Sequence, residues 1–184
     1  MTYLASAGDD GYGMQDPADF DTVVSVGGTI LKQSASGAYS EIVWPDTGGG
    51  CSVVPKPTWQ KDPDCTYRTG NDVAAVAFWA AEYDTYEEEG WITVRGTSVA
   101  SPLTAGVFGL AGNAKRQYGA ENIWNLAARD PKKLAKELHT NITGTDEGCP
   151  ASFSGTYICQ TGTNGFGTYS SPTGWGSPNG IAAF

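Results

Sequence analysis

Arg95-Gly96-Thr97-Ser98-Val99-Ala100-Ser101-Pro102 is the stretch that decides the fold of this 184-residue chain. The β-branched and aromatic run 91–94 precedes it and predicts a strand. After it, apolar residues recur at helical spacing, at Leu103, Val107, Leu110 and Ala111. Ser98 is therefore expected where the end of a strand turns into a helix.

Ser98 has two interpretations at such a junction. Its hydroxyl can cap the helix by accepting hydrogen bonds from the first free backbone amides, or it can act as a nucleophile that faces a cleft. A lone Gly-Thr-Ser favours the cap, because capping serines greatly outnumber catalytic ones. The longer pattern Gly-Thr-Ser-x-Ala-x-Pro leads into a helix of small residues, and it resembles the nucleophile segment of the subtilisin and sedolisin peptidases.

This resemblance implies an α/β protein with the subtilisin-like three-layer fold and a mostly parallel sheet. It also implies that Ser98 is the nucleophile, at a helix N-terminus whose dipole favours a developing oxyanion. Arg95 departs from the pattern, since these families usually have a small residue there. A long cation beside the nucleophile would either alter a substrate subsite or point to solvent.

Composition and charge narrow the function classes. The chain has the length of a single domain, 1–184, and its 40% of hydrophobic residues suffice for a core. The net charge is −9, and no basic cluster is longer than Lys132-Lys133, which argues against nucleic acid and anionic membranes as partners. No stretch approaches the roughly 20 apolar residues of a membrane span. We therefore expect a soluble domain.

The four cysteines fall into two local pairs, Cys51 with Cys65 and Cys149 with Cys159. Four cysteines allow three connectivities, and two short loops flanked by Gly, Asp and Pro make sequential pairing the easiest to close. The alternative is four reduced, partly buried thiols. Disulfides would indicate an exported, extracellular protein.

A Gly and Asp loop follows a short apolar strand at the start of the chain. Asp9-Asp10-Gly11 taken alone predicts a tight turn, since Asp and Gly tolerate left-handed conformations. Ser6-Ala7-Gly8-Asp9 also resembles the sedolisin segment whose Asp supplies the oxyanion hole, whereas subtilisins use an asparagine there. A carboxyl donates a hydrogen bond only while it is protonated, so this role for Asp9 requires an acidic site.

Two other glycine-containing runs match the sedolisin pattern. The run 22–31 predicts a buried strand, followed by a sharp bend at Gly27-Gly28. Gly48, Gly49 and Gly50 predict a flexible loop from composition alone. They would also let the backbone approach a bound peptide closely. In sedolisins the corresponding region lines the substrate cleft, which makes the three glycines candidate substrate-binding residues.

The remaining polar positions have mainly structural interpretations. Asp72 enters an apolar strand and is expected to cap a turn. The acidic segment 82–89 predicts a solvated hairpin. His139 is the single histidine, and a dipole contact at a helix end or a surface position is expected for it. Subtilisins place their base histidine in a His-Gly-Thr context before the serine, and His139 has neither that context nor that order.

The turn-rich region at about 140–180 resembles the sedolisin calcium region, where two carboxylates and several carbonyls bind the ion. Asn141, followed by Ile142, stands at the first carboxylate position, and Ser170 stands at the second. Calcium prefers several hard oxygens that carry enough negative charge. Losing both carboxylates should weaken this site severely, so at most weak calcium binding through Asn141 and carbonyls is expected.

The sedolisin mechanism also requires a glutamate base and a supporting aspartate, which lie upstream of the Ser-Ala-Gly-Asp motif. Eight residues precede Asp9 here, and no glutamate between Asp9 and Ser98 matches that motif. The first interpretation is therefore the C-terminal part of an acid-acting serine endopeptidase that acts on peptides or proteins. As an isolated chain it should be nearly inactive, because an unassisted hydroxyl is a weak nucleophile.

Two alternatives remain open. One is an inactive, peptide-binding pseudoenzyme. The other is a subtilisin-like Ser-His-Asp peptidase, against which Asp9 argues. Strands missing from a parallel sheet would leave an edge unpaired. The first interpretation therefore also predicts a complementary N-terminal fragment or self-association.

Overall fold

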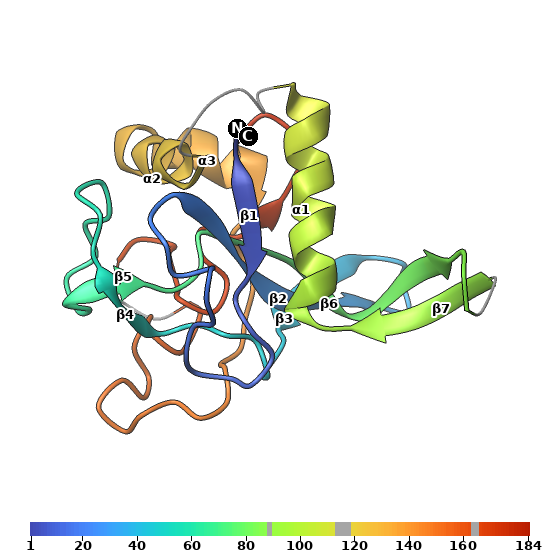
Figure 1. Ribbon diagram of the computed structural model, residues 1–184, viewed down its shortest axis with the longest axis horizontal. Coiled ribbons are helices and arrows are strands. Elements are labelled where there is room, and N and C mark those ends of the chain that lie inside the picture. The colour runs from blue at the N-terminus through green and yellow to red at the C-terminus, as the bar shows by residue number, and fades with distance from the viewer. Residues whose placement is uncertain (88–89, 113–118, 163–165) are drawn as a thin grey trace.

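The computed structural model describes residues 1–87, 90–112, 119–162 and 166–184 (Figure 1). Its elements, in chain order, are β1 (Tyr3–Ser6), β2 (Val23–Gln33), β3 (Tyr39–Val43), β4 (Cys51–Pro55), β5 (Tyr67–Thr69), β6 (Val73–Asp84), β7 (Gly90–Arg95), α1 (Thr97–Ala111), α2 (Gly119–Arg129), α3 (Pro131–Glu137), β8 (Leu138–His139) and β9 (Ser177–Pro178).

The main sheet has a parallel centre. Its order is β1-β2-β6-β7, with β1 parallel to β2 and β2 parallel to β6, whereas β3 and β7 join antiparallel. Helix α1 packs along β1, β2 and β6, and α2 contacts β2 and α3. In Figure 1 the β6–β7 hairpin projects away from this body. The expected hairpin is therefore present, although its Glu88 and Glu89 lie outside the described residues.

The expected bend at Gly27-Gly28 is wrong, because β2 runs through both glycines without interruption. Their role is close packing. A β-carbon at Gly27 would collide with the Asn71 side chain, and one at Gly28 would lie 2.7 Å from the Ala77 Cβ and 2.7 Å from the Trp44 ring. The sequence pattern of a turn here marks a position where neighbouring groups approach the strand backbone.

Helix α1 is unusual because none of its 15 residues is charged. Its buried positions include Ala100, Thr104 and Phe108, whereas Leu103 is 49% and Leu110 is 77% exposed. The helical spacing of the leucines predicted the helix but not the face that packs. A helix that is apolar all round is typically buried, so the exposed face of α1 is suited to further packing.

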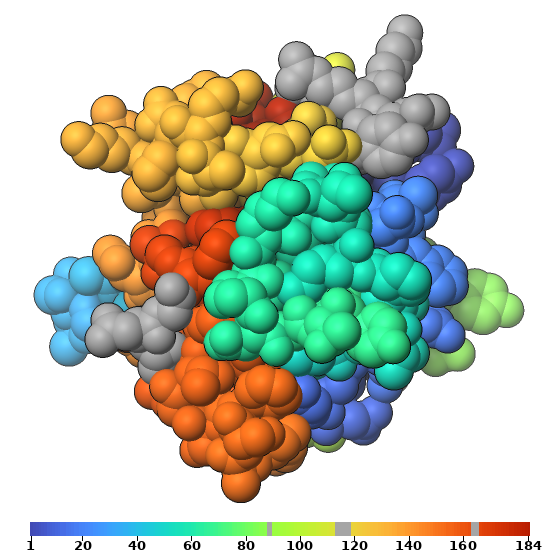
Figure 2. Space-filling view, turned by 90° about the vertical axis from the view of Figure 1, so that its left-hand side faces the viewer, coloured from blue at the N-terminus to red at the C-terminus, as the bar shows by residue number. Residues whose placement is uncertain are grey.

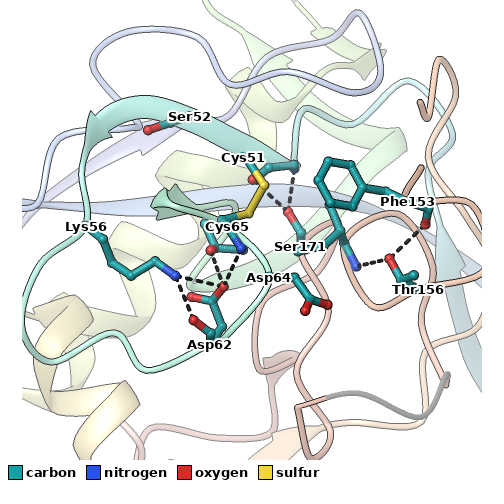
Figure 3. Close-up of a disulfide and its surroundings, with 12 residues drawn as sticks. Cys51, Ser52, Lys56, Asp62, Asp64, Cys65, Phe153, Thr156 and Ser171 are labelled. Carbon is teal, nitrogen blue, oxygen red and sulfur yellow. Dashed lines mark hydrogen bonds and ion pairs between the residues drawn. A yellow bond between two sulfur atoms is a disulfide. The ribbon is translucent and has the colours of Figure 1, made fainter. Parts of the chain in front are cut away.

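Both sequentially paired disulfides are present, Cys51–Cys65 and Cys149–Cys159, and no cysteine is free. Figure 3 shows the first one with Lys56 and Asp62 beside it. Lys56 Nζ lies 3.1 Å from Asp62 Oδ2, which also accepts from the Thr69 hydroxyl at 2.6 Å. The disulfide and this ion pair hold the β4–β5 loop together. Within the described ranges, no helix combines the length and the apolar character that crossing a membrane requires.

Candidate active site

Ser98 lies at the predicted junction between β7 and α1. Gly96 is the N-cap residue, with φ 129°, and its N–H donates to the Ala77 carbonyl at 2.7 Å. The N-cap glycine has no side chain with which to cap the helix, and Ser98 is the second helical residue. Because Ser98 is exposed and lies inside the first turn, the interpretation of this serine as an N-cap does not hold.

Asp9 reaches the start of the same helix from the loop after β1. Its Oδ1 accepts from the Thr97 backbone N–H at 2.7 Å and from the Thr97 hydroxyl at 2.7 Å. The Thr97 hydroxyl in turn accepts from the Gly8 N–H at 3.1 Å. A carboxylate at a helix N-terminus is favoured by the helix dipole. Thr97 therefore fixes Asp9 by two hydrogen bonds to a single oxygen.

The second oxygen of Asp9 faces the same small space as Ser98. A β-carbon built on Gly96 would lie 2.7 Å from Asp9 Oδ2 and 3.0 Å from Ser98 Oγ. Among the described residues, the Ser98 hydroxyl has no hydrogen-bond partner. The arrangement places a hydroxyl oxygen and a carboxyl oxygen next to the same position, which only a glycine leaves open. Residues 9 and 98 are thus brought together, and their roles as oxyanion donor and nucleophile stay predictions.

Replacing Gly96 with alanine tests this packing. The added methyl would contact Asp9 Oδ2, and φ 129° is a conformation that L-residues rarely adopt. We expect G96A to lower the free energy of unfolding by about 1–3 kcal/mol in urea denaturation. G106A is the matched control, since Gly106 lies within the helix whose N-cap residue is Gly96. A methyl at Gly106 would meet nothing within 4 Å, so this variant should be slightly more stable than the wild type. Equal stabilities of the two variants would show that Gly96 is not constrained.

The Gly48–Gly50 run packs against the Asp9 loop and is buried. Each of its N–H and C=O groups has a hydrogen-bond partner in the chain, among Gly8, Gly13, Gly70, Asn71 and Ser171. These backbone groups are therefore already in use within the fold. The glycines allow close approach, as expected, but the backbone that they approach is that of the Asp9 loop. Direct contact with a peptide stays a prediction.

No general base contacts Ser98 in the part of the chain that the structure describes. His139 is exposed on β8, which pairs with β9. Asp72 is fully buried and hydrogen-bonded to Ser25, Arg68 and Trp124, in agreement with a structural role. Burial raises the pKa of Asp72, and the Arg68 guanidinium acts in the opposite sense. The site as described thus combines the Ser98 hydroxyl with the Asp9 carboxyl, and no described histidine or glutamate is hydrogen-bonded to that hydroxyl.

The residues of the calcium-type region do not fit a calcium ion. Asn141 is exposed and lines a surface pocket with Ile142 and Glu41, whereas Ser170 is buried and its hydroxyl lies 2.9 Å from the Thr173 hydroxyl. An amide and a hydroxyl supply no negative charge. Among the described residues, the one group of three potential metal ligands combines Asp146 with Cys149 and Cys159, whose sulfurs are joined in a disulfide.

Two polar residues of this region were not singled out by sequence reasoning. Thr97 lies within the Gly-Thr-Ser motif, yet its contact with Asp9 spans 88 positions and leaves no local pattern. Asn71 donates to the carbonyls of Gly48, Ser171 and Pro172 and so connects the glycine run to the C-terminal segment. Only a comparison with related chains could have drawn attention to them.

Comparisons with known proteins identify peptidases to which the chain is similar. No family model matches the chain. It is 28% identical over 221 residues to sedolisin from Pseudomonas sp. (strain 101), and this match covers 96% of this chain and 33% of sedolisin. It is 34% identical over 130 residues to kumamolisin from Bacillus sp. (strain MN-32), covering 57% of this chain and 24% of kumamolisin.

A solved structure of Pseudomonas sedolisin, described as a serine-carboxyl proteinase complexed with two molecules of pseudo-iodotyrostatin, superposes with a TM-score of 0.71. The identity is 27%, and the match covers 97% of this chain and 53% of that chain. The fold is therefore the α/β fold of the subtilisin-like peptidases, with a partial domain covered. Within that class, the chain resembles the sedolisin-like serine-carboxyl peptidases, and the match fits a C-terminal portion of their catalytic domain. It spans about a third or less of the length of these curated relatives.

Proposed function

We propose that this chain supplies the nucleophile and the oxyanion donor of an acid-acting serine endopeptidase. Ser98 would attack the carbonyl of a peptide or protein substrate, and protonated Asp9 would donate a hydrogen bond from Oδ2 to the oxyanion. The observation that carries the proposal is the single space between Asp9 Oδ2 and Ser98 Oγ beside Gly96. A donor close to the attacked carbon stabilises charge where it develops.

Thr97 supports this division of roles between the two oxygens of Asp9. Oδ1 accepts two hydrogen bonds from Thr97, and Oδ2 is then the oxygen available to hold a proton. Donation to an oxyanion requires the protonated carboxyl, so the proposed step is limited to acidic solution. The proton of the Ser98 hydroxyl needs an acceptor, and the resemblance assigns that role to a glutamate supported by an aspartate upstream of the matched segment.

We propose further that a complementary N-terminal segment covers the apolar face of α1. Leu103 and Leu110 are exposed on that face, and β1 is at the end of the sheet, with Tyr3 62% exposed. Burying an uncharged helix face and pairing a free strand edge would both stabilise the assembly. Self-association through the same face is the alternative. The two disulfides support secretion into an oxidising compartment.

The test is covalent labelling of Ser98 at about pH 4 by a fluorophosphonate probe, with S98A as the control. We expect no labelling of the isolated folded chain, because the hydroxyl has no base. Adding the N-terminal half of the sedolisin catalytic domain should produce labelling in the wild type and none in S98A. D9N should reduce that labelling strongly.

Two results would contradict the proposal. Labelling of the isolated wild type, absent from S98A, would mean that a base is present within these residues. A complemented assembly that forms but is never labelled would favour the pseudoenzyme, in particular if it still binds a peptide aldehyde reversibly.

A further inference from the structure

A second pocket lies where three distant segments of the chain meet. Its volume is about 360 Å³, and its walls come from the β4–β5 loop, from α2 with the start of α3, and from the C-terminal segment. Figure 2 shows these segments adjoining on one face, in teal, amber and red-orange. The residues of the candidate active site do not line it. Its lining residues are Trp59, Lys61, Trp124, Ala127, Ala128, Pro131, Phe166, Gly167, Thr168 and Trp175.

Four aromatic rings line this pocket, and three of them lie around the fourth, Trp124. The centroid of the Trp124 ring lies 6.0 Å from that of Trp59, 6.0 Å from that of Phe166 and 5.3 Å from that of Trp175. The indole N–H of Trp124 donates to Asp72 Oδ1 at 2.8 Å, which fixes the orientation of this ring. The walls are thus held before any ligand arrives, and preformed apolar walls with few polar groups are typical of binding sites.

The polar groups at the pocket select the charge of a ligand. Aromatic boxes often bind ammonium groups, but the single charged residue among the described residues that line this pocket is the cation Lys61. Lys61 is exposed and has no hydrogen bond or ion pair with the described residues. Thr168 adds an exposed hydroxyl at the rim. An apolar ligand that carries a carboxylate is therefore favoured over a cation.

We propose that this pocket binds the C-terminal aromatic residue of a peptide, with its ring packed against Trp59, Trp124 and Phe166 and its carboxylate at Lys61. The volume is at the small end of the roughly 300–1,000 Å³ of ligand sites, which suits one residue and not an extended segment. A free aromatic amino acid fits less well, because its ammonium group would lie near Lys61 and the described lining has no carboxylate to pair with it. In a peptide the same nitrogen is a neutral amide. The proposal does not depend on catalysis at Ser98.

The experiment titrates the S98A chain with short peptides and follows the indole N–H signals by NMR. Gly-Gly-Phe is expected to shift the signals of Trp59, Trp124 and Trp175, whereas Gly-Gly-Gly should not. The C-terminal amide of Gly-Gly-Phe should bind about two- to fivefold more weakly, as expected for the loss of one exposed ion pair. Free phenylalanine should also bind more weakly than the peptide acid.

Two variants distinguish the contact between Lys61 and the carboxylate from non-specific apolar binding. K61Q should bind the acid and the amide of Gly-Gly-Phe equally, while K32Q, which removes an exposed lysine on β2, should keep the preference. Tighter binding of tetramethylammonium than of Gly-Gly-Phe would overturn the proposal in favour of a cation site. Three other results would also overturn it. They are equal binding of the acid and the amide by the chain that keeps Lys61, tighter binding of free phenylalanine than of Gly-Gly-Phe, and no shift of the indole signals with any peptide.

Discussion

Replacing Asp72 with alanine is expected to destabilise the chain by about 3–5 kcal/mol, far more than the loss of an exposed ion pair would. Asp72 Oδ2 accepts from Arg68 at 2.6 Å and from the Ser25 N–H at 2.8 Å, and Oδ1 accepts from the Trp124 indole. The side chains of Arg68 and Asp72 are both fully buried. Removing the carboxylate therefore leaves a buried cation without its counter-ion and two buried N–H donors without acceptors.

The measurement is thermal unfolding followed by circular dichroism at pH 6. D72A should lower the midpoint by roughly 6–20 °C relative to the wild type. D72N keeps the shape but removes the charge, so it should also destabilise strongly. D21A is the matched control and should change the midpoint little, because Asp21 is exposed and has no hydrogen bond or ion pair with the described residues. If D72A and D21A unfold at the same temperature, the ion pair is not important for stability.

A double variant distinguishes the charge from the packing. Replacing Arg68 with methionine in the D72N background removes the unpaired cation, although it also removes the Arg68 hydrogen bonds to the carbonyls of Phe20 and Val23. Part of the stability lost in D72N should return in the double variant, since the two residues are in direct contact. Additive losses from the two single changes would show instead that they contribute independently.

The sequence predicted the elements whose signals are local. The caps and spacing of the helices are such signals. Asp130 accepts from the Lys133 N–H at 3.0 Å at the start of α3, with Pro131 in the first turn, a local combination that is typical of helix N-termini. The junction that carries Ser98 was also predicted, because a strand run, a glycine and a helical run follow each other directly. Asp9 could be connected to Ser98 only through the family resemblance.

What the sequence did not predict depends on contacts between distant segments. Gly27 and Gly28 were interpreted as a bend because nothing near them in the sequence shows that the Asn71 and Trp44 side chains lie against them. The exposed leucines of α1 are a similar case, since helical spacing does not determine which face is covered. The aromatic pocket combines three segments that are separated by 63 positions, from Lys61 to Trp124, and by 35 positions, from Pro131 to Phe166, so no short window of the sequence contains it.

Asp146 is the clearest example of a residue whose environment the sequence did not predict, because its sequence context is that of an ordinary turn. The side chain is only 3% exposed, and neither carboxyl oxygen has a hydrogen-bond partner among the described residues. A β-carbon at Gly49 would lie 3.3 Å from Asp146 Oδ2, so this carboxyl lies against the glycine run that supports the Asp9 loop. Burial raises the pKa of Asp146 from 3.8 to about 7.

The direction of the pH effect follows from this raised pKa. Below about pH 4 the carboxyl is protonated in both the folded and the unfolded chain, so it costs no stability. Between pH 4 and pH 7 the unfolded chain releases the proton while the folded chain keeps it, and the free energy of unfolding falls as the pH rises. Above pH 7 the full cost is present, on the order of 4 kcal/mol for the difference between 3.8 and about 7.

D146N should therefore be more stable than the wild type at pH 8 by up to a few kcal/mol and similar to it at pH 4. Urea denaturation at both pH values measures the difference, and any packing cost of the amide cancels because it is common to both. E147Q, the neutral variant of the exposed neighbour, should give the same difference from wild type at pH 4 and pH 8. A D146N effect that does not change with pH would mean that Asp146 is not protonated in the folded chain. The expected result would make the fold most stable, as far as Asp146 is concerned, in acid, where the role proposed for Asp9 would also operate.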